Sequence, residues 1–370
     1  MRIGYDAKRI FHNSTGLGNY GRDVVRILNQ HTSISHFFLF NTKASRREYS
    51  LYEGKNTIIY PNTWFWKKFP TLWRMFGQWK QIRENNLAIY HGLTGEIPFS
   101  PFKQTTAKTV TIHDLIFLSH PQYYNVWDRI IYRLKFKYAS KKADRIIAIS
   151  EQTKSDIMKF FKIDEKKITV VYQGCHNLFK EPLDGESKER TKKKFNLPDE
   201  YILNVGTLQE RKNALALIKA IEGTPYHLVL VGQEKKYAKK LHDYVDRHQL
   251  QSQVTFIKDS NLHQLVAIYQ CATLFCYPSI CEGFGIPVIE ALYSRIPVIV
   301  SKGGCFPESA GPDSVFIDPN DTEEIRREIT RLFNDPSERK RIVEKGFAYV
   351  QRFSDQNVAK NLMEVYKSIL

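Results

Sequence analysis

The feature that most constrains the fold is an alternation of strands and helices that runs through the chain twice. In the first half, short apolar runs predict strands at residues 2–5, 36–40, 58–60, 88–90, 110–112, 146–149 and 168–171. Helical patterns such as 19–29, 127–140 and 151–161 lie between them. Nearly continuous apolar runs are typical of parallel strands that helices cover on both faces. This half therefore predicts a doubly wound α/β domain.

The alternation starts again after a polar, lysine-rich stretch at 180–194, which we interpret as a linker whose end can be helical. Further strands are predicted at 201–205, 227–231, 254–257, 273–277, 297–300 and 314–317, and the tail from 322 onward is predicted to be helical. We expect an α/β fold of two Rossmann-like, doubly wound parallel-sheet domains, at 1–178 and 179–352. The C-terminal helix, about 353–370, is expected to pack back on the first domain.

Composition limits the compartment and the class of partner. No stretch approaches the roughly 18 apolar residues of a membrane span, and the first six residues indicate a strand rather than a signal peptide. A cytoplasmic protein is expected. The spacing of the five cysteines predicts buried thiols rather than a metal or disulfide site. The net charge of +16 favours an anionic partner: nucleic acid, a phosphorylated ligand or an anionic membrane.

The loop after the strand at 273–277 carries two carboxylates, Glu282 and Glu290. Ligands of open parallel sheets bind beyond the carboxyl ends of the strands. Gly-rich residues precede Pro287, which is well placed in the first turn of a helix, and a helix start attracts anions. We expect Glu282 in the loop and Glu290 one turn inside the helix, where they can contact different parts of one extended ligand. The alternative is an ordinary Gly-rich turn.

A second loop, from Gly206 to Asn213, follows the first strand of the second half and contains Arg211 and Lys212. Arg can hold a diphosphate through its planar fork and Lys as a point charge. Positive charge at a helix start conflicts with the helix dipole. That conflict favours a functional pair over an exposed structural one.

Two loops of the first half are weaker candidates. His113 and Asp114 end a strand, where a polar pair indicates function more than a lone histidine would. Gly16, Gly18 and Gly21 form a Gly-x-Gly-x-x-Gly pattern between the first strand and the first helix. A loop of about ten residues and the lack of a well-placed acidic residue argue against a dinucleotide fingerprint and against hydride transfer.

Together these segments resemble glycosyltransferase family 4, the group 1 retaining enzymes of the GT-B fold, in its mannosyltransferase-like branch. The segment from Pro278 to Ala291 is similar to the family's signature with two glutamates. Gly206–Leu208 with Arg211–Asn213 is similar to the donor-phosphate loop, and His113–Leu115 to a sugar-contacting segment. The resemblance covers nearly the whole chain.

The resemblance implies a role for each residue. Arg211 and Lys212 would bind the donor diphosphate, helped by N–H groups near Phe284 and Gly285 and by the loop at Gly206 and Thr207. Glu290 would reach the nucleotide ribose and Glu282 the transferred sugar. His113 would contact the donor sugar, and Gly16 and Gly18 would allow close approach of donor and acceptor. The catalytic set is therefore Glu282, His113, Arg211 and Lys212, with no metal, no cofactor and no protein base.

The segment from Trp64 to Lys80 holds four of the five tryptophans. Its aromatic and aliphatic residues fall on one helical stripe, with a helix expected to begin near Pro70. Two interpretations stay open: an interfacial helix on an anionic bilayer, or a buried helix with basic flanks. The residues that would contact the membrane or the acceptor are Trp64, Trp66, Lys67, Lys68, Trp73 and Arg74.

We therefore expect a hexosyltransferase of surface polysaccharide or lipopolysaccharide biosynthesis. The donor is a GDP- or UDP-sugar, with GDP-mannose preferred by the branch resemblance, and the acceptor is a glycan or a lipid-linked sugar. The rival interpretations are a nucleotide-sugar epimerase of the same fold, a catalytically silent binder, and a basic nucleic-acid-binding protein. The basic residues are spread along the chain and form no recognised nucleic-acid module, so no nucleic-acid partner is expected.

Overall fold

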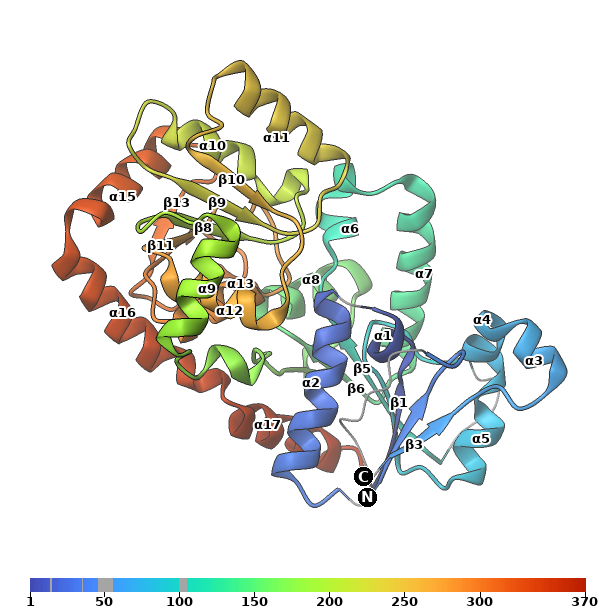
Figure 1. The fold of residues 1–370 in the computed structure, drawn as a ribbon. Helices are drawn as coiled ribbons and strands as arrows, with labels where there is room; N and C mark the ends of the chain where they lie inside the picture. Colours follow the sequence, from blue (N-terminus) through green and yellow to red (C-terminus); the bar gives the residue numbers. More distant parts are fainter. Residues whose placement is uncertain (14, 35, 46–55, 100–104) are drawn as a thin grey trace. The chain divides into compact units, whose positions relative to one another are not determined.

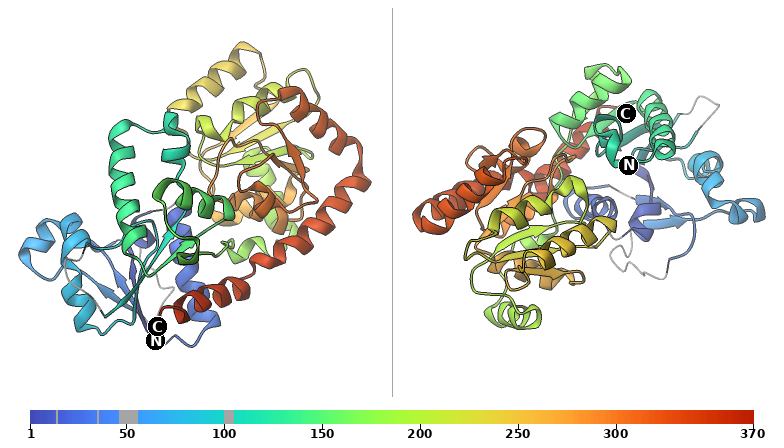
Figure 2. Two further views of the ribbon diagram at one scale, coloured as in Figure 1. Left: turned by 180° about the vertical axis from the view of Figure 1, so that it is seen from behind. Right: turned by 90° about the horizontal axis from the view of Figure 1, so that it is seen from above.

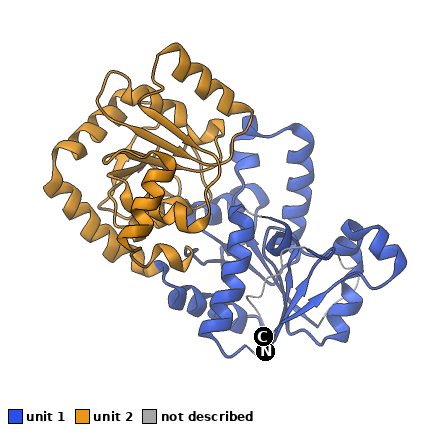
Figure 3. Cartoon of the chain, viewed as in Figure 1, with its two compact units in different colours: residues 1–174, 353–370 blue, residues 175–352 orange. Residues whose placement is uncertain are grey.

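The computed structural model describes all residues except 14, 35, 46–55 and 100–104. It forms two compact units (Figure 3). Unit 1 contains residues 1–174 and 353–370, and unit 2 contains residues 175–352. The division lies four residues before the expected boundary at 178, and the last segment of the chain belongs to unit 1.

Unit 1 is built on a parallel sheet of seven strands, as the apolar runs predict (Figure 1). The strand order is β3-β2-β1-β4-β5-β6-β7. The strands are β1 (Arg2–Asp6), β2 (His36–Phe40), β3 (Asn56–Ile59), β4 (Ile89–Gly92), β5 (Ala107–Ile112), β6 (Arg145–Ala148) and β7 (Ile168–Val170). Successive residues of β6 enter different cores: Ile147 packs in the core with α2 (Gly16–His31), and Ile146 packs in the core with α7 (Val126–Lys142). Helices therefore cover both faces of the sheet (Figure 2).

The other helices of unit 1 are mostly short. They are α1 (Lys8–His12), α3 (Trp64–Lys68), α4 (Pro70–Leu72), η2 (Trp73–Gly77), α5 (Trp79–Glu84), α6 (Ile116–Ser119), η3 (Pro121–Tyr123), α8 (Glu151–Phe161) and η4 (Glu165–Lys167).

The last helix, α17 (Asp355–Lys367), packs against α2. Asp355 forms an ion pair of 2.6 Å with Arg26 of α2. The hydroxyl of Tyr366 lies 3.1 Å from the hydroxyl of Tyr5 and 2.8 Å from Nδ1 of His91. These buried contacts explain why the end of the chain belongs to unit 1.

The glycine pattern after β1 does not form the single loop that the sequence suggested. Helix α1 occupies the start of this connection, and Gly16 and Gly18 lie in the first turn of α2. A Cβ atom at Gly18 would lie 2.0 Å from the carbonyl oxygen of Asn13. Gly18 is therefore required for the tight turn between the two helices.

The segment from Trp64 to Lys80 does not form one helical stripe. Pro70 begins α4, as expected, but the chain then passes through the π-helical turn η2 into α5. Trp73 is fully buried and donates a 3.0 Å hydrogen bond to Gln81. Arg74 is also buried, in ion pairs with Asp6 and Glu96. Of the two interpretations, the buried one therefore holds for Trp73 and Arg74, which are excluded as membrane-contacting residues. On α3, Trp64, Lys67 and Lys68 are exposed and Trp66 is half-buried.

Unit 2 is built on a parallel sheet of six strands in the order β10-β9-β8-β11-β12-β13. The strands are β8 (Ile202–Val205), β9 (Leu228–Val231), β10 (Val254–Ile257), β11 (Leu274–Tyr277), β12 (Val298–Ser301) and β13 (Val315–Ile317). The helices are η5 (Asn177–Phe179), α9 (Gly185–Phe195), η6 (Glu210–Lys212), α10 (Ala214–Ile221), α11 (Lys236–Arg247), α12 (Leu262–Cys271), α13 (Ile286–Tyr293), α14 (Phe306–Ala310), α15 (Thr322–Asn334), α16 (Pro336–Val350) and η7 (Gln351–Phe353).

The expected linker at 180–194 is mostly the helix α9 of unit 2. The side chain of Asp184 accepts a 2.7 Å hydrogen bond from the backbone N–H of Ser187 and so caps the helix start. The helix packs on α12 although Thr191 is its one buried residue. Lys, Arg and Glu are good helix formers, so a polar sequence forms a helix here once one side has a partner.

Candidate functional site

Loops that follow three neighbouring strands of unit 2 are joined at the carboxyl end of the sheet. The loop after β8 contains η6 with Arg211 and Lys212. The loop between β11 and α13 contains Glu282, and the loop after β12 contains Cys305. This edge is where open parallel sheets bind ligands. The structure thus brings together the two basic residues and the first glutamate of the predicted site.

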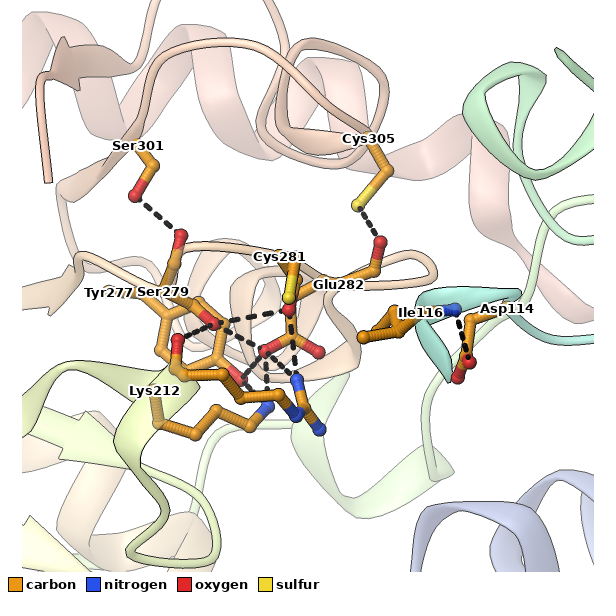
Figure 4. Close-up of polar contacts among 10 residues, drawn as sticks. Asp114, Ile116, Lys212, Tyr277, Ser279, Cys281, Glu282, Ser301 and Cys305 are labelled. Carbon is orange, nitrogen blue, oxygen red and sulfur yellow. Dashed lines mark hydrogen bonds and ion pairs between the residues drawn. The ribbon is translucent and has the colours of Figure 1, made fainter. Parts of the chain in front are cut away.

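One oxygen of Glu282 accepts every contact that this carboxylate makes (Figure 4). Its Oε1 lies 3.1 Å from Nη1 of Arg211 and is hydrogen-bonded to Nζ of Lys212. It also accepts hydrogen bonds of 2.7 Å from Ser279 and 3.1 Å from Tyr277. Oε2 has no partner among the described residues, so it can accept a hydrogen bond from a ligand.

The charges of this cluster perturb one another strongly. Burial alone would raise the pKa of Glu282, but Lys212 and Arg211 outweigh it and lower the pKa to about 2. Burial lowers the pKa of Lys212, and the Glu282 carboxylate opposes that shift. One carboxylate and two cations leave a net positive charge on a largely buried cluster, which is an environment that attracts an anion.

Hydrogen bonds between the loops hold the cluster in place. Nη1 of Arg211 donates a hydrogen bond of 2.9 Å to the carbonyl oxygen of Cys281. The carbonyl oxygen of Arg211 accepts one of 2.8 Å from the N–H of Ile280. The hydroxyl of Ser301, at the end of β12, donates a hydrogen bond of 2.7 Å to the carbonyl oxygen of Ser279. The thiol of Cys305 donates 3.4 Å to the carbonyl of Glu282. The backbone carbonyls of Arg211 and Glu282 are therefore both held by a neighbouring loop.

The start of α13 is arranged as the sequence predicts. Gly285, at the N-cap of α13, has φ 97°, a backbone conformation that favours glycine, and Pro287 lies in the first turn. Phe284 is buried beside it. Glu290 lies inside the helix and accepts a 2.9 Å hydrogen bond from the hydroxyl of Tyr269. Glu282 and Glu290 thus occupy the loop and the helix, as expected.

Gly206 and Thr207 lie between β8 and η6. The chain is crowded here, because a Cβ atom at Gly232 would lie 2.1 Å from the carbonyl oxygen of Gly206. The two residues therefore run close to the loop after β9, and Lys212 extends beside Gly206, with Cε 3.7 Å from where a Gly206 Cβ would be.

His113 of unit 1 lies in a different kind of environment. Its Nε2 lies 2.9 Å from the carbonyl oxygen of Leu93, which can only accept, so Nε2 carries the proton. Nδ1 then accepts 3.0 Å from the side-chain amide of Gln173. Burial lowers the pKa of His113 to about 4, and the imidazole is neutral at pH 7. Both ring nitrogens are engaged within unit 1, which disfavours a proton-transfer role.

Asp114 does not pair with His113. Its carboxylate accepts a 3.2 Å hydrogen bond from the N–H of Ile116 and so supports the start of α6 (Figure 4). The predicted pair therefore splits into a buried neutral ring and a turn-forming carboxylate.

Two side chains that contact Glu282 received no role from the sequence. Tyr277 and Ser279 both donate to Oε1 of Glu282, and both are buried. They flank Pro278 at the end of a predicted strand, and this position was the available signal. Polar groups at the last buried position of a parallel strand often face the ligand edge.

The part of the chain that the structure describes holds no group of three or more His, Cys, Asp or Glu side chains arranged to bind a metal ion. None of its helices combines the length and the apolar character needed to span a bilayer.

Family models match both units. Residues 16–176 match the model described as Glycosyltransferase Family 4, and residues 185–349 match Glycosyl transferases group 1. The second match contains the whole Arg211–Lys212–Glu282 cluster.

The chain is similar over its full length to curated relatives and to solved structures. It is 26% identical to O-antigen chain mannosyltransferase B of Escherichia coli, over 99% of this chain and 100% of that protein. It is 27% identical to O-antigen chain mannosyltransferase RfbU of Salmonella typhimurium, over 78% of this chain and 77% of that protein. The structure of Anabaena Alr3699/HepE in complex with UDP and glucose superposes with a TM-score of 0.78 at 16% identity, covering both chains completely. This likeness shows a GT-B fold of two Rossmann-like domains.

Proposed function

Since the chain belongs to the family 4, group 1 glycosyltransferases, we propose that it transfers mannose from GDP-mannose, with retention, to a glycan or lipid-linked acceptor. The setting is the biosynthesis of a surface polysaccharide or lipopolysaccharide, which the O-antigen relatives support. UDP-sugars are the second choice of donor. The observation that carries the proposal is the net positive cluster of Arg211, Lys212 and Glu282 at the ligand edge of unit 2.

Arg211 and Lys212 bind the donor diphosphate. As the bond between the sugar C1 and the diphosphate oxygen breaks, negative charge develops on the leaving group, and pre-placed cations stabilise it. The N-terminus of α13, near Phe284 and Gly285, adds its dipole. Two fixed cations supply the charge stabilisation that a metal ion would otherwise supply, so the reaction proceeds without a metal.

Glu282 changes partners when the donor binds. In the structure its Oε1 is bound to Lys212 and Arg211, the cations that the diphosphate needs. The diphosphate takes over part of these contacts, and the carboxylate then accepts hydrogen bonds from hydroxyl groups of the sugar through Oε2. The acceptor hydroxyl attacks C1 from the side of the leaving group, and the departing diphosphate takes its proton.

The remaining predicted residues orient the donor. Glu290, held by Tyr269, accepts from the nucleotide ribose, and Gly206 and Thr207 let the backbone approach the phosphates. Both nitrogens of the neutral His113 ring are engaged within unit 1, so the ring contacts the sugar by its shape and not by a hydrogen bond. Gly16, exposed in the first turn of α2, allows the donor and acceptor to approach closely, and the buried Gly18 keeps that turn close to Asn13.

The enzyme acts in the cytoplasm, at the inner face of the membrane. Trp64, Lys67 and Lys68 of α3 are exposed, and Trp66 is half-buried. Exposed tryptophan next to lysine suits the interface of an anionic bilayer, where a lipid-linked acceptor is found.

The first test is thermal stabilisation of the purified protein by GDP-, UDP- and ADP-sugars in the presence of a chelator. We expect stabilisation by GDP-mannose, because a ligand that binds the folded state raises its stability by mass action. Stabilisation by a UDP-sugar alone would show that the donor is a UDP-sugar and not GDP-mannose. If no nucleotide-sugar stabilised the protein, the role proposed for the cluster would be contradicted. If the protein converted the donor to an isomer in the absence of an acceptor, its activity would be epimerisation and not transfer.

Turnover tests the role of Glu282 directly. We expect Glu282→Gln to lower kcat about 10²-fold or more, as removal of a transition-state contact does, while nucleotide binding is retained. Unchanged turnover would contradict the role proposed for the carboxylate.

A further inference from the structure

Exposed apolar side chains are distributed unevenly over the molecule. Thirteen large hydrophobic side chains are exposed among the described residues, and all thirteen belong to unit 1. Ten of them lie on two segments, the stretch 64–76 and the helix α7. They are Trp64, Phe65, Phe69, Leu72, Phe76, Val126, Trp127, Ile130, Ile131 and Leu134. A soluble surface rarely concentrates apolar side chains in this way without a partner.

Helix α7 carries two apolar sides. One contains Phe136 and Ala139 and packs into the core beneath it. The other is exposed: Trp127 is 76%, Ile131 47% and Leu134 65% accessible. At about 100° per residue, positions 127, 130, 131 and 134 share an arc of about 100°, roughly opposite the packed side. We call these four residues the α7 row. The sequence did not reveal it, because the two apolar sides cancel the ordinary amphipathic pattern.

Aromatic contacts connect the α7 row with the 64–76 stretch. Tyr138 lies one turn after Leu134, and its ring is 4.1 Å from that of Phe99. The ring of Phe99 in turn stacks at 5.4 Å on that of Phe76. Phe65 and Phe69 continue the stretch, with ring centroids 5.2 Å apart. These ring contacts therefore connect the two segments within unit 1, and Figure 1 labels their helices α3, α4 and α7.

The charge around the two segments is basic. The segment 63–80 contains no Asp or Glu, and Lys67 and Lys68 are exposed on it. The α7 row is flanked by basic residues at Arg133, Lys137 and Lys141. The one acidic residue of α7, Asp128, is held at the helix start by hydrogen bonds with Asn125.

We infer that the α7 row and the exposed 64–76 side chains together form a bipartite docking surface for an anionic lipid bilayer. Apolar rows with tryptophan, bordered by lysine and arginine, match an interface of acyl chains below anionic headgroups. The inference extends the proposed membrane contact from α3 to α7. It does not require the proposed sugar transfer.

Flotation with vesicles tests the surface. The probes are vesicles of phosphatidylcholine alone and vesicles that also contain phosphatidylglycerol. We expect the wild-type protein to float with the anionic vesicles and much less with the neutral ones. The double variant Ile131→Ser/Leu134→Gln should bind anionic vesicles about tenfold more weakly, because two apolar side chains no longer insert. The control Leu370→Gln changes a side chain of similar exposure, 69%, outside the surface and should bind like wild type.

A second measurement locates the contact. Brominated lipids quench tryptophan emission on contact, so Trp127→Phe should lose part of the quenching seen in the wild-type protein. Equal melting temperatures and equal stabilisation by nucleotide show that the α7 variants remain folded. They also separate this inference from the proposed reaction, which fails if no nucleotide binds even though vesicles do.

Several outcomes would overturn the inference. One is the absence of wild-type binding to anionic vesicles. Another is unchanged binding of the α7 double variant, which would leave α3 as the whole contact. A third is a wild-type dimer in solution that the double variant converts to a monomer while vesicle binding persists. In that case a second copy of the chain, and not lipid, covers the α7 row.

Discussion

Both units place a small cluster of charges near the carboxyl ends of their parallel strands, and the two clusters have opposite designs. In unit 1 one cation, Arg74, lies between two carboxylates, those of Asp6 and Glu96. In unit 2 one carboxylate, Glu282, lies between two cations. Lys135, 3.4 Å from Glu96, balances the first cluster, whereas the second keeps a net positive charge. The balanced cluster ties elements together, and the unbalanced one is suited to receive an anion.

The difference shows that burial and perturbed pKa values do not by themselves identify a binding site. Arg74 is as deeply buried as Lys212, and its pKa is raised although burial opposes that shift. Its donors are used by Asp6 and Glu96, which join β1 to the loop after β4 and to η2. The residual charge, which is zero in the cluster of unit 1 and positive in that of unit 2, distinguishes the two clusters.

The largest effect should follow removal of a cation from the unbalanced cluster. We expect Lys212→Ala to lower kcat by about 10²–10³, since the diphosphate loses a pre-placed charge. Initial rates with saturating donor measure it. Lys340→Ala, which changes a lysine 79% exposed on α16, is the control and should keep the wild-type rate. A variant Lys212→Ala with wild-type turnover would contradict the comparison.

Removal of the cation from the balanced cluster should affect stability instead. Arg74→Met leaves Asp6 and Glu96 without their partner and should lower the free energy of unfolding by about 3–5 kcal/mol. Urea unfolding followed by circular dichroism measures the loss. Lys80→Ala breaks an exposed pair with Glu84 and should cost less than about 1 kcal/mol. If Arg74→Met were as stable as Lys80→Ala, the cluster would not tie the unit together.

The low pKa of His113 should make stability depend on pH. The pKa of His113 is about 4 in the folded protein, below its ordinary value of 6.5. The unfolded state therefore binds a proton at this ring at a higher pH than the folded state does. The stability that depends on the neutral ring is fully present above pH 6.5 and is lost as the pH falls from 6.5 toward 4. Lowering the pH from 7.5 to 5.5 should therefore reduce the free energy of unfolding by about 1.4 kcal/mol through His113.

Urea unfolding at the two pH values measures this loss. His113→Gln should reduce the difference between them, while His263→Gln, at an exposed position of α12, should not. An unchanged difference in His113→Gln would show that the ring is not held neutral.

The smallest effect concerns nucleotide affinity. Glu282→Gln removes the internal carboxylate that occupies Arg211 and Lys212, so GDP should bind roughly two- to tenfold more tightly than to wild type. Calorimetric titration measures the affinity, and Ser279→Ala, which keeps the charge, should change it less. Weaker binding in Glu282→Gln would show that the carboxylate supports the diphosphate rather than competing with it.

Much of the fold was predictable because parallel strands are buried on both faces and so leave apolar runs such as 36–40 and 274–277. The placement of Glu282 and Glu290 followed from Gly285 and Pro287, which are local signals for a helix start. The contacts of Tyr277 and Ser279 with Glu282 were not predicted, because their position at the end of a strand indicates the ligand edge but not which carboxylate they contact. Trp73 and Arg74 were misassigned because helical periodicity cannot show a π-helical turn that moves these side chains inward.

The contact between α17 and α2 sets an order of events during synthesis. Tyr5, His91 and Tyr366 meet in one buried network, although 361 positions separate the first from the last. The first unit to leave the ribosome therefore cannot be completed until the whole of unit 2 has been translated. Unit 2, whose residues form one uninterrupted stretch, can fold earlier, because domains fold as units during synthesis. Until α17 has been translated, the part of α2 that this helix covers stays exposed.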